Sequence, residues 1–327
     1  MLEIFRKNLF INSVLLLPYI ILVRLATFIY PQKYQVQENS SEIIKIIYLF
    51  LDNPLLQSTI AVVLIFIQAI IINHIFIKHR LSREITLLPG LIYVVFVTIV
   101  MDFTVLSPVL LGNTFIIFAL MNLLKTYKLP NAVAFIFNSG FYISVASIFY
   151  TPYIFMVFFG VIILLILRSF KLLEKIQYFS GFIIPYFFLF TFRYLTNAKL
   201  ADLTVLKEVF FRLPYFESNF LIVNYISIGF IILSVLVCLF NYGSLTGKKV
   251  IQTQKKVDVF YWVLLYSLVS FLIFSTEGSL HLLTLAVPLS VLTGILISDS
   301  KAKISHELLH FMVLALIFLT QFKLLVL

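Results

Sequence analysis

The fold of this chain is decided by runs such as residues 55–77, LLQSTIAVVLIFIQAIIINHIFI, which contain no lysine, arginine, aspartate or glutamate. An α-helix of about 20 mostly apolar residues is long enough to cross a hydrocarbon core about 30 Å thick. Basic residues follow the run at once, at Lys78 and Arg80. The pattern predicts a membrane-spanning helix, and blocks of similar length and composition fill almost all of the remaining chain.

Composition supports the same interpretation for the whole chain. Of 327 residues, 62% are hydrophobic and 12% are charged, and the mean hydropathy is +1.09. Soluble domains are about half apolar, with about a quarter of their residues charged. We therefore expect an all-α, polytopic transmembrane helix bundle that forms one integral membrane domain over 1–327. Its outer loops are 31–54 and 195–218, and its inner loop is 241–257.

The apolar blocks predict about eleven spans. They cover residues 9–30, 55–77, 86–102, 106–124, 131–150, 152–168, 177–195, 219–240, 258–275, 279–298 and 307–326. The charged N-terminus followed by a run to Tyr30 resembles a signal peptide. Because the run is too long and no small-residue cleavage site follows, we interpret it as an uncleaved first span.

Positive charge predicts the orientation of the bundle. With the N-terminus inside and the C-terminus outside, 16 of the 24 lysines and arginines fall on the inner side. Such a bias is typical of cytoplasmic segments, so the net charge of +10 does not indicate a nucleic-acid partner. The single cysteine, Cys238, excludes an intrachain disulfide.

Two outer segments, 41–52 and 200–212, show apolar residues at near-helical spacing. Each predicts a short helix that either lies in the membrane interface or packs on the bundle as a lid. Within the spans, no GxxxG pair signals a close helix crossing. With 36 Phe and 17 Tyr, bulky aromatic packing is the expectation instead.

Ionisable residues at the outer span ends are the candidates for a functional site, because such groups are costly near lipid. In this topology they could line one outward-facing cavity. Snorkelling arginines and capping acids are the alternative interpretation. The candidates are Arg24, Asp102, Tyr150, Arg193, Arg212, Glu277 and His281.

The inner loop carries four lysines, Lys248, Lys249, Lys255 and Lys256. They are explained by topology alone, or they bind anionic lipid or an acidic partner. No metal-binding or nucleotide-binding motif is present.

Three stretches of the chain carry a resemblance to known membrane proteins. They are 34–42 (YQVQENSSE), 137–152 (FNSGFYISVASIFYTP) and 281–290 (HLLTLAVPLS). With its span number, the chain distantly resembles the GT-C superfamily of glycosyltransferases, which use polyprenyl-phosphate sugars at the outer face. It is also similar to an uncharacterised family of bacterial multi-pass inner-membrane proteins.

The resemblance implies an enzyme of the bacterial cytoplasmic membrane that handles a lipid-linked sugar in envelope glycan assembly. Glu38 or Glu42 would then act as general base, and Arg24, Arg193 or Arg212 would hold the donor phosphate. No acidic pair follows the first span directly, and the chain has no soluble outer domain. Two other functions therefore stay open: a non-catalytic scaffold of an envelope complex with other membrane proteins, and a lipid or solute transporter.

Overall fold

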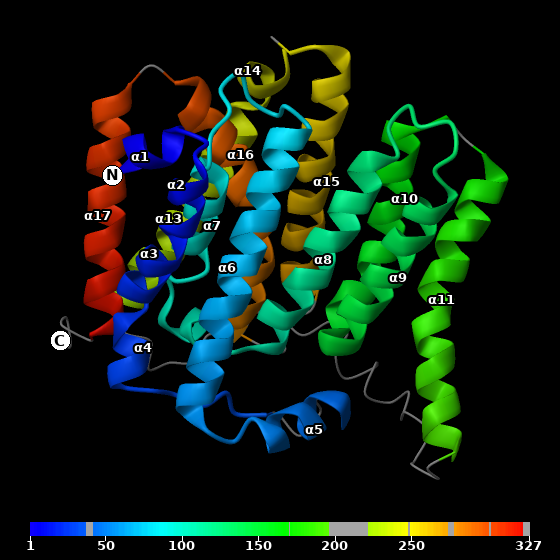
Figure 1. Cartoon of the computed structure of the whole chain (residues 1–327), viewed down its shortest axis with the longest axis horizontal. Helices are drawn as coiled ribbons and strands as arrows, with labels where there is room; N and C mark the ends of the chain where they lie inside the picture. Colours follow the sequence, from blue (N-terminus) through cyan, green and yellow to red (C-terminus); the bar gives the residue numbers. More distant parts are fainter. Residues whose placement is uncertain are drawn as a thin grey trace.

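The computed structural model describes residues 1–36, 42–169, 171–195, 222–247, 249–273, 278–300 and 302–322. Over these ranges the chain forms a bundle of α-helices and short 3-10 helices, labelled η (Figure 1). The elements are α1 (Leu2–Arg6), α2 (Phe10–Val14), α3 (Leu16–Val23), α4 (Leu25–Ile29), α5 (Glu42–Phe50), α6 (Pro54–Lys78), α7 (Leu88–Phe96), η1 (Met101–Thr104), α8 (Pro108–Lys125), α9 (Val133–Phe149), η2 (Thr151–Phe155), α10 (Met156–Leu167), α11 (Leu172–Leu195), α13 (Ile222–Phe240), α14 (Tyr242–Thr246), α15 (Ile251–Ile273), η3 (Gly278–Leu285), α16 (Ala286–Asp299) and α17 (Lys303–Gln321).

The chain is a multi-pass helical membrane protein. Among the described residues, five helical segments are long and apolar enough to cross a membrane, and four shorter apolar segments accompany them. The five are Pro54–Lys78, Pro108–Lys125, Ile251–Ile273, Gly278–Asp299 and Lys303–Gln321. The described part of each of the eleven predicted spans contains helix, but several of these helices are shorter or more broken than the apolar pattern predicts.

The first predicted span, 9–30, is not one continuous helix. It divides into α2, α3 and α4, with breaks at Leu15 and Arg24. Pro18 has no N–H to donate to the carbonyl of Val14, which explains the first break. At Arg24 the backbone leaves helical geometry, with φ −107° and ψ 21°, so the side chain of Arg24 sits at a bend inside the span.

The third predicted span, 86–102, is also shortened, because α7 ends at Phe96. Just beyond that end, the hydroxyl of Thr98 donates to the carbonyls of Val94 and Val95, at 2.7 and 3.2 Å. Threonine side chains that bond to preceding carbonyls compete with the regular helix ladder. The chain then turns through η1 and enters α8 at Pro108.

The helices run alternately up and down, so the connections gather at two opposite ends of the bundle (Figure 1). We call them the α5 end, which holds α5, η1, η2 and η3, and the α14 end, which holds α14 and the loops 79–87 and 126–132. The gaps that we expect in the cytoplasm all lie at the α14 end. That this end faces the cytoplasm stays a prediction.

Helix α5 confirms the helix predicted over 41–52, and one of its faces packs on the bundle, as the lid interpretation expects. Ile44 and Tyr48 are buried with Tyr34, and Val105 and Leu280 pack against this small cluster. The hydroxyl of Tyr48 donates to the carbonyl of Leu106. On the other side, Leu49 and Phe50 are 77% and 83% exposed, as expected for a face that contacts lipid. The second predicted segment, 200–212, lies outside the described residues.

Helices α9 and α11 pack through a close crossing that the search for GxxxG pairs missed. A Cβ atom on Gly140 of α9 would overlap the carbonyl oxygen of Tyr178 on α11. Reciprocally, a Cβ atom on Gly181 of α11 would overlap the carbonyl oxygen of Phe137 on α9. One glycine from each helix is enough to let two backbones touch, so no spaced motif within one helix is needed.

We expect Gly140→Ala to destabilise the bundle by about 1–3 kcal/mol, because the methyl group meets backbone that cannot rotate away. Gly229→Ala is the matched control, since nothing lies within 4 Å of a Cβ atom at that helical position. It should leave stability unchanged or raise it by about 0.5–1 kcal/mol. Unfolding in mixed detergent micelles measures both, and equal stability of the two variants would contradict the close crossing.

Candidate functional site

Two of the 3-10 turns meet at the α5 end, and their contact brings predicted site residues together. The carboxylate of Asp102 in η1 accepts a hydrogen bond from the hydroxyl of Ser279 in η3. Ser279 is buried and Asp102 is half-buried, so this bond is partly shielded from the surroundings. Asp102 therefore joins two turns that are far apart in sequence.

His281, two residues further along η3, is completely buried and has a partner on each ring nitrogen. Its Nδ1 atom is hydrogen-bonded to the hydroxyl of Tyr150, at the end of α9. Its Nε2 atom lies 3.1 Å from the hydroxyl of Ser270 on α15. Because a hydroxyl can donate or accept, a neutral imidazole is satisfied here in either tautomer. Tyr150 and His281 thus pair with each other, as part of the packed interior.

Further side chains satisfy backbone carbonyls in these turns. The hydroxyl of Tyr266 donates to the carbonyl of Pro152 in η2, at 2.9 Å. The amide of Asn113 donates to the carbonyl of Leu283 in η3, at 3.2 Å, and accepts from the hydroxyl of Tyr153. Backbone polar groups at membrane depth have no water to bind, so such partners hold irregular turns in place.

Arg24 differs from these paired side chains, because two of its buried donors lack a partner among the described residues. Its side chain is completely buried, which excludes the alternative that it snorkels to the surface. One guanidinium nitrogen, Nη2, donates to the carbonyl of Thr104 in η1. The Nε and Nη1 atoms are buried and have no hydrogen-bond partner in the described part of the chain. A buried guanidinium with two unused donors is costly unless an anion binds beside it.

A cavity of about 560 Å³ lies at the α5 end beside the residues that hydrogen-bond Arg24, although Arg24 itself is not among the residues that line it. Its wall includes Thr104, which binds Arg24, and Thr27, whose hydroxyl donates to the backbone carbonyl of Arg24 at 2.7 Å. Gln321, at the end of α17, also lines it, and both amide atoms of this buried side chain have no partner among the described residues. The full lining is Ala26, Thr27, Tyr30, Gln32, Met101, Thr104, Gln321 and Phe322.

Among the described candidates, Asp102, Tyr150, Arg193 and His281 do not line this cavity. Arg193 lies in the last turn of α11, which stands at the opposite edge of the bundle from α4 (Figure 1). Glu38, Arg212 and Glu277 lie outside the described residues. Glu42 begins α5, but its side chain also lies outside what the structure describes. The described candidates therefore do not all share this cavity, and a common cavity for the whole predicted set stays a prediction.

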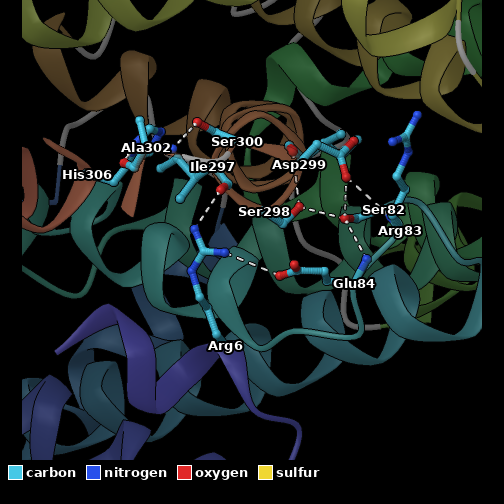
Figure 2. A network of polar contacts seen from close by, with 11 residues as sticks. Arg6, Ser82, Arg83, Glu84, Ile297, Ser298, Asp299, Ser300, Ala302 and His306 are labelled. Carbon is cyan, nitrogen blue, oxygen red and sulfur yellow. Dashed lines mark hydrogen bonds and ion pairs between the residues drawn. The ribbon is translucent and has the colours of Figure 1, made fainter. Parts of the chain in front are cut away.

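At the α14 end, Figure 2 shows a polar network that fastens the N-terminus and loop 79–87 to the end of α16. Arg6 is 3.2 Å from the carboxylate of Glu84 and donates to the carbonyl of Ile297 at 3.0 Å. Asp299 accepts from the hydroxyl of Ser82 and from the backbone N–H of Arg83, at 2.9 and 3.3 Å. The Arg6–Ile297 and Ser82–Asp299 hydrogen bonds each join segments that are more than 200 residues apart in sequence.

The four lysines of the predicted basic inner loop have different surroundings. The ammonium group of Lys249 donates to the carbonyl of Leu81 at 2.5 Å and lies 3.4 Å from Asp299. Burial lowers the pKa of Lys249, and the charge of Asp299 opposes that shift. Lys256 instead lies on α15, 4% exposed, with its ammonium group 5.7 Å from the ring centre of Tyr127. Lys255 is half-buried beside it, and Lys248 lies outside the described residues.

No protein-family model, curated protein or solved structure matches this chain. An account of its function therefore depends on the chemistry of the sites just described.

We expect Tyr150→Phe to cost about 1–3 kcal/mol of unfolding free energy, because it leaves Nδ1 of the buried His281 without its partner. Tyr142→Phe is the matched control, because no hydrogen bond of the Tyr142 hydroxyl is found in the described ranges. It should change stability by less than about 0.5 kcal/mol. The same micellar unfolding measurement compares the two, and equal costs would show that the Tyr150–His281 bond contributes no net stability.

Proposed function

We propose that this multi-pass membrane protein binds the phosphate-bearing headgroup of an anionic lipid in the cavity at the α5 end. The observation that carries the proposal is Arg24, completely buried, with its Nε and Nη1 donors unpartnered among the described residues. Guanidinium nitrogens donate strong hydrogen bonds to phosphate oxygens. The two unpartnered donors point to different edges of the group, so each would bind a separate oxygen once the wall formed by Thr27 and Thr104 opens toward Arg24.

The surroundings of Arg24 suit an amphiphile better than a small soluble anion. The cavity wall combines polar groups, such as Thr27 and Gln321, with apolar ones, such as Met101 and Phe322. Nearby, Leu25 and Ile29 of α4 are 44% and 53% exposed on a segment that we expect in the membrane. A lipid could therefore place its headgroup against the polar wall while its chain stays in the hydrocarbon region.

A lipid-linked sugar is the more specific ligand that the GT-C resemblance implies. The segment with both candidate bases begins at the cavity, since Tyr30 and Gln32 line it and Glu38 and Glu42 follow a few residues later. Helix α5, which Glu42 begins, is anchored to the loop after η1 by the Tyr48–Leu106 hydrogen bond. In this hypothesis a glutamate deprotonates the acceptor while the arginine holds the donor phosphate.

A scaffold is the second candidate, and one observation favours it. One carboxylate oxygen of Asp102 and both ring nitrogens of His281 already have partners within the protein. No acidic side chain is among the described residues that line the cavity. A site that binds a lipid without reacting with it needs no acid or base in the cavity.

The binding proposal is tested with a polyprenyl phosphate, using the polyprenol of equal chain length as the ligand control. Native mass spectrometry in a neutral detergent measures both affinities. Arg24→Gln should weaken binding of the phosphate by about tenfold or more, because it removes charged hydrogen bonds. Arg193→Gln removes the same charge at the opposite edge of the bundle and should bind as the wild type does.

Stability gives an independent result for the same variant. Without lipid, the wild type carries the cost of an uncompensated buried charge. The glutamine amide is neutral and keeps an N–H donor for the Thr104 carbonyl, so Arg24→Gln should be at least as stable. If a carboxylate of the chain paired with Arg24, the substitution would strand that group and cost about 3–5 kcal/mol. Equal binding of polyprenol and polyprenyl phosphate, or a large loss of stability in Arg24→Gln, would refute the proposal.

Catalysis is separated from scaffolding by the double variant Glu38→Gln, Glu42→Gln. Loss of a general base typically costs about 10²–10⁴ in rate, while the shape of the protein is nearly unchanged. An enzyme should therefore fail to complement a deletion strain when this variant is present at normal membrane levels. Full complementation would exclude both glutamates as the base and would leave the scaffold as the better candidate.

A further inference from the structure

The α14 end carries a second cationic site, unrelated to the cavity at Arg24. Other basic residues at this end are paired with carboxylates. Arg168 binds Glu174 through two nitrogens, at 2.8 and 2.9 Å, and donates to the carbonyls of Thr126 and Leu129 at 2.6 Å each. Together with the Arg6–Glu84 and Lys249–Asp299 contacts, these pairs engage three of the carboxylates at this end.

The same end holds lysines from three elements that form no ion pair within the described ranges. They are Lys78 at the end of α6, Lys125 and Lys128 at and after the end of α8, and Lys256 on α15. The ring of Tyr127 brings two of them together, because the ammonium groups of Lys128 and Lys256 each lie 5.7 Å from its centre. The loop that holds Tyr127 is fixed by Arg168.

His79 completes the cluster from the side of α6. The residue is 8% exposed, and its Nε2 atom is buried with no hydrogen-bond partner among the described residues. Burial, followed by the positive charges of Lys256 and Lys78, lowers the pKa of His79 to about 3. At neutral pH its imidazole is therefore uncharged, and it can still present an N–H group to an anion.

Topology and helix dipoles explain only part of this arrangement. Lys78 and Lys125 are the last residues of their helices, where a cation interacts favourably with the helix dipole. Lys256 lies in the second turn of α15, where the dipole gives no such benefit, and it is 96% buried without a carboxylate. A buried ammonium group next to other cations is costly unless an anion lies beside it.

We propose that Lys78, His79, Lys125, Lys128 and Lys256 bind the headgroup phosphate of an anionic phospholipid at the α14 end. Two of these residues end helices that are long and apolar enough to span the membrane, so the cluster lies where headgroups lie. The exposed Lys78 and Lys128 would meet the headgroup first, and the buried Lys256 and His79 would contact its phosphate.

The single tryptophan, Trp262, provides a local readout. It is on α15, six residues or about 9 Å along the helix from Lys256, and it is half-buried. Quenching of its fluorescence by brominated phosphatidylglycerol, compared with brominated phosphatidylcholine, gives a relative binding constant for lipid beside α15. The Arg24 cavity lies at the other end of the bundle, so this result is independent of the proposed function.

We expect the wild type to prefer phosphatidylglycerol, and Lys256→Gln to lower the relative constant by about fivefold. Lys255→Gln is the matched control, since it removes the same charge from the preceding residue of the same helix. This variant should keep the preference for phosphatidylglycerol. Inorganic phosphate added to the vesicles should not displace the lipid.

Three results would overturn the proposal. They are the absence of a lipid preference in the wild type, an equal loss in Lys255→Gln, which would indicate general surface charge, and displacement by inorganic phosphate, which would assign the site to a free anion. If Lys256→Gln does not fold, the double variant Lys78→Gln, Lys125→Gln replaces it. A preference unchanged by that double variant would also contradict the site.

Discussion

The structure depends on one constraint, which is that backbone carbonyls at membrane depth must find hydrogen-bond donors inside the protein. Spans that turn back through 3-10 helices at the α5 end would leave such carbonyls unpaired. Side chains supply the donors: Arg24 for Thr104, Tyr48 for Leu106 and Tyr266 for Pro152. Asn113 does the same for Leu283 in η3. The polar residues of the spans are therefore, in the first place, the means by which short turns are tolerated.

The same constraint separates structural residues from functional candidates. Tyr150 and His281 satisfy each other, and Asp102 holds η1 against η3. Arg24 also donates to a turn, but it carries a charge and two further donors that the described chain does not use. A site for an external anion is a physical reason to keep such a group buried. At the α14 end, Lys249 and Lys256 show the same contrast between a paired and an unpaired cation.

Much of the fold could be predicted from the sequence, because the length and hydropathy of a block determine whether it can span a membrane. The predicted block 55–77 corresponds closely to α6, Pro54–Lys78. The breaks were harder to see. Pro18 is visible in the sequence. The bend at Arg24 accompanies a hydrogen bond to Thr104, which is distant in sequence. The early end of α7 accompanies a local bond from Thr98 to the Val94 carbonyl, which the presence of a threonine does not by itself predict. The contact of Gly140 with α11 needs no pattern along one helix, so spacing could not reveal it.

The site was predictable only in outline. Span-end position singled out Arg24 as a candidate, but its burial, which argues against snorkelling, depends on the neighbours that pack around it. Gln321 has no charge and gave no signal. The pairing of Lys249 with Asp299 joins loops that are distant in sequence, so the four inner lysines looked alike.

The central claim is that the charge of Arg24 is neutralised by an anion from outside the chain. It is tested most directly by an electron cryomicroscopy structure of the protein in nanodiscs that contain anionic lipid. The account predicts headgroup density in the cavity, within hydrogen-bonding distance of Nε and Nη1 of Arg24 and of the amide of Gln321. A carboxylate of the chain itself bound to Arg24, with no lipid density in the cavity, would contradict it.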